Sequence, residues 1–236
     1  MAINITLVEA IHNSADASSY AFASHTFTAG NLYIAFIITS HASLQAPAVL
    51  TLNGTTAVFT NITSVIFSGA SNNLRNLEAW RFLPAANVTE VVTATLTGNT
   101  PATSGDLILL EITGHDISGI NGSGAIVQNS TVSGTTGDTT GSVTLNAFGN
   151  SNNRPLGCIV HVTAETSTVG SGFSSLDDGN HTAPSLGALT EWHATSANNT
   201  INATWTTNGK FGIIGLEIKN ASSSSIPKML GLLGVG

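Results

Sequence analysis

Short runs of strand-forming residues recur along the whole chain, and turn residues separate them. Two of the separators, Asn53-Gly54 and Asn208-Gly209, are dipeptides typical of tight hairpin turns. Many short strands joined by short turns are typical of a β-sandwich or barrel. The best candidate for a helix is a single turn at residues 70–75. The sequence therefore predicts an all-β, jelly-roll-like antiparallel β-sandwich with an extended C-terminal tail.

The predicted strands differ in how apolar they are. Residues 32–38 and 108–112 are almost continuously apolar, as expected of central strands that are buried on both faces. Their similar openings, Gly30-Asn31 and Gly105-Asp106, are compatible with an internal repeat. The predicted strands span residues 3–8, 20–28, 32–39, 48–52, 57–60, 62–67, 77–83, 88–96, 107–113, 125–128, 142–148, 158–163, 188–194, 200–206 and 211–218.

Two segments are harder to interpret. Residues 114–141 are rich in Gly, Ser and Thr, and we interpret them as a long surface loop between two halves of one sandwich, with a domain linker as the alternative. Residues 78–82 alternate, with Glu78, Trp80 and Phe82 on one face, but the pattern does not show which face is buried.

The surface of this protein must be covered mainly by neutral polar groups. Only 8% of the residues are charged, against about 25% in an ordinary domain. The six Lys and Arg residues are scattered, so no basic stripe for nucleic acid exists. No apolar run is long enough to span a bilayer, and no signal peptide is evident. We therefore expect synthesis in the cytoplasm, no nucleic-acid or membrane partner, and a surface suited to packing against other copies.

The sequence offers no convincing metal site. Cys158 lies in an apolar run and is interpreted as a buried structural thiol. Cys158 and His161 are three residues apart on a predicted strand, so they point to opposite faces. Residues 177–181 (Asp-Asp-Gly-Asn-His) are interpreted as a solvated turn, with a Ca²⁺-binding loop as the weaker alternative.

Catalytic motifs are equally scarce. The chain has no Gly-x-Ser-x-Gly nucleophile motif and no phosphate-binding loop. Glu78, Glu111, Glu191 and Glu217 lie in predicted strands and most simply occupy solvated or edge faces. Paired carboxylates for glycoside cleavage stay open as an alternative. We expect a protein that is not an enzyme, without catalytic residues, cofactor or metal.

The C-terminus is different in character from the rest. We predict a single sandwich domain over residues 1–219, followed over residues 220–236 by a Ser-rich spacer and an apolar tail. An apolar end on a polar spacer is poorly explained by a self-contained domain. The candidate partner-binding residues are Ile226, Pro227, Met229, Leu230, Leu232 and Leu233.

Several stretches together resemble a known class of protein. The segments SHTFTAGNLYIAFIITSHA, LRNLEAWRFLPAANVTEVVTATLTG, GDLILLEITGHDISG and GKFGIIGLEIK are similar to β-sandwich modules of tailed-phage virion proteins, namely capsid decoration (cement) proteins and minor structural or adhesin-like proteins. The resemblance covers about residues 3–219 in strand order and turn composition. It does not extend to the apolar tail.

This resemblance implies a homotrimeric jelly-roll module on the outer surface of the virion. Its partners would be copies of itself and the major capsid protein or another virion protein, whose neighbouring subunits it would clamp together. It implies no catalytic residues. The alternative is a carbohydrate-binding adhesin or tail-fibre domain, in which Trp80, Trp192 and Trp205 would form a sugar-stacking platform. Such tryptophans are more often anchors of a core or an interface.

Overall fold

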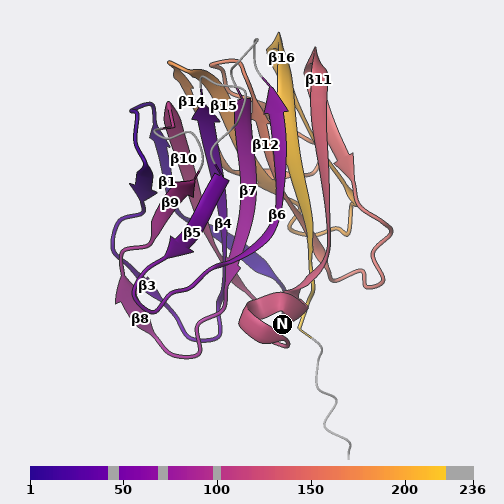
Figure 1. Cartoon of the computed structure of the whole chain (residues 1–236). Helices are drawn as coiled ribbons and strands as arrows, with labels where there is room; N and C mark the ends of the chain where they lie inside the picture. The colour runs from indigo at the N-terminus through magenta and orange to yellow at the C-terminus, as the bar shows by residue number, and fades with distance from the viewer. Residues whose placement is uncertain (42–47, 69–73, 98–101, 222–236) are drawn as a thin grey trace, which may run out of the picture.

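The computed structural model describes residues 1–41, 48–68, 74–97 and 102–221. In these residues short turns join β-strands, and the helical element is a single 3-10 turn, η1 (Ile120–Ala125). Two large antiparallel sheets face each other, and smaller layers cover their outer faces (Figure 1). The prediction of an all-β antiparallel sandwich is confirmed.

Each large sheet comes from one half of the chain. The N-terminal sheet has the spatial order β1 (Asn4–Asn13), β10 (Ser104–Thr113), β4 (Leu32–His41), β7 (Leu74–Phe82) and β6 (Thr60–Ser68). The C-terminal sheet has the order β11 (Ile126–Thr144), β16 (Thr200–Ile218), β12 (Arg154–His161), β15 (Ser185–Trp192) and β14 (Ser174–Thr182), and β13 (Thr168–Val169) also pairs with β16. Because neither large sheet mixes strands from the two halves, a jelly-roll strand order is not confirmed.

The two large sheets repeat one topology. In each, the five long strands lie in the order first, last, second, fourth and third along the chain, and every pair is antiparallel. The contacts between the edges of the two large sheets repeat as well. In each case the first strand of one sheet lies against the third strand of the other, β1 against β14 and β11 against β6. The similarity at Gly30 and Gly105 does not reflect this repeat, because those residues open β4 and β10, which are neighbours in one sheet.

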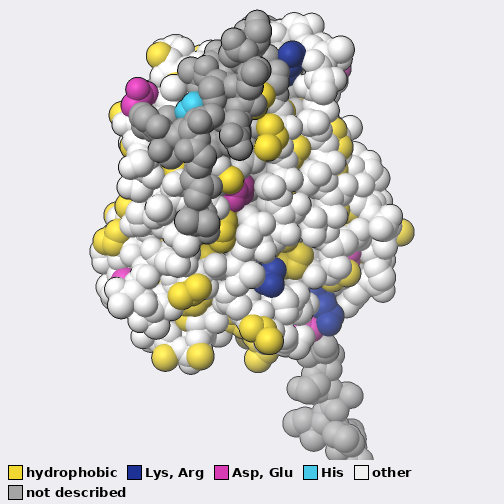
Figure 2. All heavy atoms as spheres, viewed as in Figure 1, with side chains coloured by type: hydrophobic (Ala, Val, Ile, Leu, Met, Phe, Trp, Pro, Cys, Tyr) yellow, Lys and Arg dark blue, Asp and Glu magenta, His cyan; other side chains and the backbone are white. Residues whose placement is uncertain are grey.

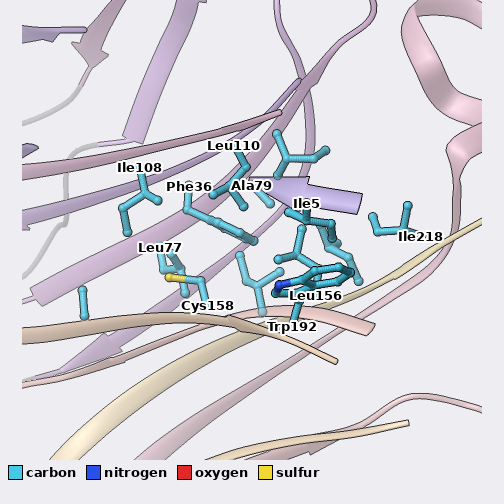
Figure 3. Packing of buried hydrophobic residues seen from close by; sticks show 14 of the residues in the cluster. Ile5, Phe36, Leu77, Ala79, Ile108, Leu110, Leu156, Cys158, Trp192 and Ile218 are labelled. Atoms are coloured by element: carbon cyan, nitrogen blue, oxygen red, sulfur yellow. The ribbon is translucent and has the colours of Figure 1, made fainter. Parts of the chain in front are cut away.

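The main core lies between the inner faces of the two large sheets. Figure 3 shows Phe36 and Leu110 of the N-terminal sheet facing Leu156, Cys158 and Trp192 of the C-terminal sheet. All five side chains are buried. Each half of the chain therefore removes the other half's apolar face from water.

A second core covers the outer face of the N-terminal sheet. One small sheet contains β2 (Ser19–Ala21), β9 (Thr93–Thr97) and β5 (Ala48–Asn53), and the other contains β3 (His25–Phe27) and β8 (Val88–Glu90). Tyr33 and Leu109 are buried against these sheets, so β4 and β10 are covered on both faces, as predicted. In β7, Trp80 and Phe82 face this second core while Ala79 faces the main core, so both faces are buried.

A third core covers the outer face of the C-terminal sheet, where part of the β11–β16 ribbon bends back over the sheet. Near the start of β16, Ile201 packs on Gly157 of β12, and a Cβ at Gly157 would overlap the Ile201 side chain. Glycine is thus needed for the close approach of the two layers. Trp205 and Phe211 are buried in the same core.

Two of the predicted loops and turns are wrong. The surface loop predicted at residues 114–141 ends at Ile126, where β11 begins. This strand has few apolar residues. It is therefore held mainly by its backbone hydrogen bonds to β16 and not by the burial of one of its faces. The tight turn predicted at Asn208-Gly209 does not form, because β16 runs through both residues. The pairing of β16 with β11 is irregular here, and its register shifts on both sides of Asp138.

Other local predictions fare differently. The chain does reverse after Asn53: this residue pairs with Val58, and the amide of Gly54 donates to the carbonyl of Ala57 at 2.8 Å. Most of the predicted helical turn at residues 70–75 lies outside the described residues, and its last two residues belong to β7.

Candidate functional site

Segments far apart in the sequence meet at one end of the sandwich, where the described chain leaves β16 beside η1 and the N-terminus (Figure 1). The amide of Ala221 donates to the carbonyl of Gly114 at 2.9 Å. The side chain of Asn220 donates to the carbonyl of Met1 at 2.7 Å. We call this region, from which the chain passes into residues 222–236, the tail-exit end.

Charged and polar contacts fix the loop that follows β10 at the tail-exit end. Asp116 forms an ion pair with Lys219 at 2.6 Å and accepts a hydrogen bond from the amide of Ser118 at 2.7 Å. These contacts, chiefly that with Lys219, lower the pKa of Asp116 to about 2. The loop therefore stays tied to the end of β16 across the ordinary pH range.

Asn121 anchors η1 to the N-terminal sheet. Its side-chain amide donates to the carbonyl of Val58 at 3.0 Å and to Thr60 Oγ1 at 2.9 Å, and its Oδ1 accepts from the amide of Leu83 at 2.8 Å. Its backbone is left-handed, with a φ of 50°, a region that Asn tolerates better than most residues. The same amide also donates to the carbonyl of Arg81 at 3.4 Å, so the position of η1 is set by contacts to β6, to β7 and to the residues beside them.

The anchored loop presents two isoleucines to solvent. Ile117 is 68% exposed and Ile120 is 88% exposed, and neither contributes to any of the three cores. We call these two residues the isoleucine pair. Apolar side chains are visible on this end of the molecule in Figure 2. A hollow of ≈ 330 Å³ lies beside Ile117 and is lined by that residue and Ala221, among others.

The structure does not test the residues that the sequence predicts to bind a partner. They are Ile226, Pro227, Met229, Leu230, Leu232 and Leu233, and all of them lie outside the described residues. What the structure adds is the position of Ala221, the last described residue before them, which lines the same hollow as Ile117.

The three tryptophans proposed for sugar stacking are not brought together. Trp80 is buried in the second core, Trp192 in the main core and Trp205 in the third core. The indole N–H of Trp80 donates to Glu78 at 3.0 Å, and that of Trp205 donates to the carbonyl of Asp138 at 2.9 Å. All three are core anchors in separate layers.

The expectation that strand glutamates occupy solvated faces is wrong for three of the four. Glu78, Glu191 and Glu217 are buried, and Glu111 is partly buried. Glu78 accepts from the amide of Val49 at 2.7 Å, in addition to Trp80. Burial raises the pKa of Glu78. This carboxylate ties the small sheet of β5 to β7.

The other two buried glutamates also act as local fasteners. Glu191 accepts from the amides of Gly170 and Asn202, both at 3.1 Å, and burial raises its pKa to about 7. Glu217 accepts from the side chains of Asn153 and Gln128, both at 2.6 Å. Glu78 lies on β7 of the N-terminal sheet, whereas Glu191 and Glu217 lie on β15 and β16 of the C-terminal sheet, with β12 between them. Each carboxylate is held by its own set of hydrogen-bond donors.

The predictions for Cys158 and His161 are confirmed. Cys158 is fully buried in the main core, where burial raises the pKa of its thiol. His161 lies on the other face of β12 and stacks on Trp205 with ring centroids 4.7 Å apart. Within the described ranges, no group of three or more His, Cys, Asp or Glu side chains is arranged to hold a metal ion.

A largely buried charged cluster, in which Asp106 is fully buried, joins the two large sheets where β1 meets β14. His12 Nδ1 lies 3.4 Å from Asp106 Oδ2, and His12 Nε2 lies 3.2 Å from Asp177 Oδ2. His181 Nε2 lies 3.3 Å from Asp106 Oδ1. Asp106, then Asp177, raise the pKa of His12 to about 10 against the opposing effect of burial. At neutral pH His12 is therefore an imidazolium that bridges two carboxylates on different sheets.

Sequence reasoning missed this cluster. Residues 177–181 form part of β14, which pairs with β15, so the solvated turn and the Ca²⁺-binding loop are both wrong. Gly179 within this strand leaves room for the His12 ring, which a Cβ would overlap. The usable signal is the register of β1 and β10, which places His12 opposite Asp106, but it appears only once the strands are paired.

No known protein family, curated protein or solved structure matches this chain. In the described part of the chain, no helix is both long and apolar enough to cross a membrane.

Proposed function

We propose that this protein is a non-enzymatic structural protein of a virion, a capsid decoration or cement protein that clamps neighbouring subunits on the particle surface. The observation that carries the proposal is the tail-exit end. There, an isoleucine pair is held out to solvent at the origin of an apolar tail. Exposed apolar side chains next to an apolar tail are suited to docking against another protein surface rather than to chemistry on a small molecule.

The use of charge supports a structural role. Glu78 and Glu191 accept hydrogen bonds from backbone amides, and Asp116 is tied to Lys219, so these carboxylates already serve as fasteners of the fold. The low charge of the whole chain also supports a structural role, because few charged side chains have to be desolvated when another protein covers such a surface.

The test is to locate the chain and then remove it. Particles from the natural source are analysed by mass spectrometry and by protease treatment of intact particles. We expect the chain in stoichiometric amounts and accessible from outside. Particles stripped of it should rupture at a lower temperature, and adding back the purified chain should restore the original value. Absence of the chain from the particles, or unchanged heat resistance after stripping, would refute the proposal.

A further inference from the structure

We propose that the isoleucine pair is the docking site for the apolar C-terminal segment of a second copy of this chain. The inference rests on the structural role proposed above and names the partner of the tail.

The site is prepared for binding before any partner arrives. Ile117 lies between Asp116 and Ser118, whose side-chain and backbone contacts fix the loop, and Ile120 precedes Asn121, which is hydrogen-bonded to β6 of the N-terminal sheet. A loop that is already ordered loses little conformational entropy on binding. Two large apolar side chains on a fixed backbone have the character of an interface hot spot.

The tail has the composition that this site requires. Residues 226–236 contain Ile226, Met229, Leu230, Leu232, Leu233 and Val235, and the one charged side chain among them is Lys228. The segment is therefore strongly apolar. Ala221, the last described residue before the tail, lies at the same end of the molecule as the isoleucine pair.

The spacer favours a second copy over the tail's own copy. Ala221 and Ile117 line the same hollow, so the tail begins beside the isoleucine pair of its own copy. The Ser-rich residues 222–225 can span roughly 13 Å when extended. To reach the pair of its own copy, the apolar segment would have to reverse direction within these four residues, whereas an extended spacer leads it to a neighbouring molecule.

Each copy then carries one docking segment and one docking site. Such contacts are heterologous, and they close into a ring when the rotation between copies allows it.

The first experiment measures self-association of the purified chain by sedimentation equilibrium. We compare the full chain, a chain ending at Ala221, and the double variant Ile117→Ser/Ile120→Ser. Ile66→Ser is the matched control, because Ile66 is 56% exposed on β6 and is not part of the tail-exit end. Truncation and the double variant should each weaken association about tenfold or more, while the control keeps it. Far-UV circular dichroism confirms that each variant is folded.

The second experiment separates docking between copies from docking within one copy. The chain ending at Ala221 keeps the site, and the double variant keeps the segment, so mixing them should give a one-to-one complex although neither associates alone. A full chain that stays monomeric at high concentration, or a mixture that stays apart, would overturn the inference.

The outcomes also separate this inference from the proposed function. A double variant that no longer self-associates but still binds particles supports the inference and the particle role together. Self-association that is insensitive to both changes overturns the inference and leaves the particle role standing. Loss of association in a chain that is absent from particles supports the inference and refutes the particle role.

Discussion

His12 holds the two large sheets together where β1 meets β14, because its imidazolium lies between Asp106 and Asp177. Its pKa of about 10 in the folded protein is above the ordinary value of 6.5. The stabilisation from this group is therefore complete below pH 6.5 and is lost as the pH rises through about 10. On the acid side, the pKa of Asp106 is lowered from 3.8 by its histidine partners against the effect of burial, so its contribution is lost below pH 3.8.

We expect His12→Gln to lower the melting temperature by roughly 5–10 °C at pH 6, because it leaves buried carboxylates without their cation. The difference between the variant and the parent should shrink above pH 10, where His12 is neutral in the parent too. Thermal unfolding followed by circular dichroism from pH 5 to pH 11 measures both effects. His193→Gln is the control, since burial lowers the pKa of His193 and it cannot contribute to the alkaline slope. A constant difference across the whole range would contradict this role.

Glu191 provides a pH dependence of the same sign as that of His12, but in a lower pH range. Burial raises its pKa from 4.5 to about 7, so the folded state disfavours the charged carboxylate. Stability should therefore fall by about 3 kcal/mol as the pH rises from 4.5 through 7. In Glu191→Gln this slope should disappear, although the variant loses one backbone hydrogen bond at every pH. Urea unfolding at pH 5 and pH 8 compares the two slopes, and equal slopes would show that Glu191 does not titrate in this way.

At the scale of elements, η1 depends on one residue for its position. Asn121→Ala removes the contacts to Val58, Thr60 and Leu83 and forces an alanine into a left-handed backbone. We expect a loss of about 1–3 kcal/mol in the free energy of unfolding. Asn121→Gly accepts the backbone conformation but makes no side-chain contacts, so it separates the two causes. Chemical denaturation measures the change, and a neutral Asn121→Ala would show that η1 is held by other contacts.

The same scale shows what a sequence pattern can and cannot reveal. The apolar runs at β4 and β10 were predictable because both faces of each strand are buried, which leaves a continuous signal. β11 has few apolar residues that would reveal its pairing. In β14, Asp177 and His181 enter a charged contact with the other sheet, which the polar sequence of this strand does not reveal. The His12 cluster could not be predicted because its members come from β1, β10 and β14, and their meeting depends on how the two sheets pack.

At the scale of the whole molecule, the repeated topology gives each half of the chain an outer core of its own, yet the main core belongs to both. Leu156 of the C-terminal sheet, for example, is fully buried in the core that it shares with Phe36 of the N-terminal sheet. A molecule built in this way should unfold in one step if the shared core dominates, and in two steps if the outer cores suffice.

We expect one step, and the tryptophans provide local probes because they lie in different layers. A variant that keeps only Trp80 reports on the second core, and one that keeps only Trp205 reports on the third core, with Phe replacing the other tryptophans. In each variant the urea midpoint from fluorescence should coincide with that from circular dichroism. Leu156→Ala should then cost about 2–5 kcal/mol by both probes, because the shared core stabilises both halves. Separate midpoints for Trp80 and the global signal would mean that the two sheets fold as independent units.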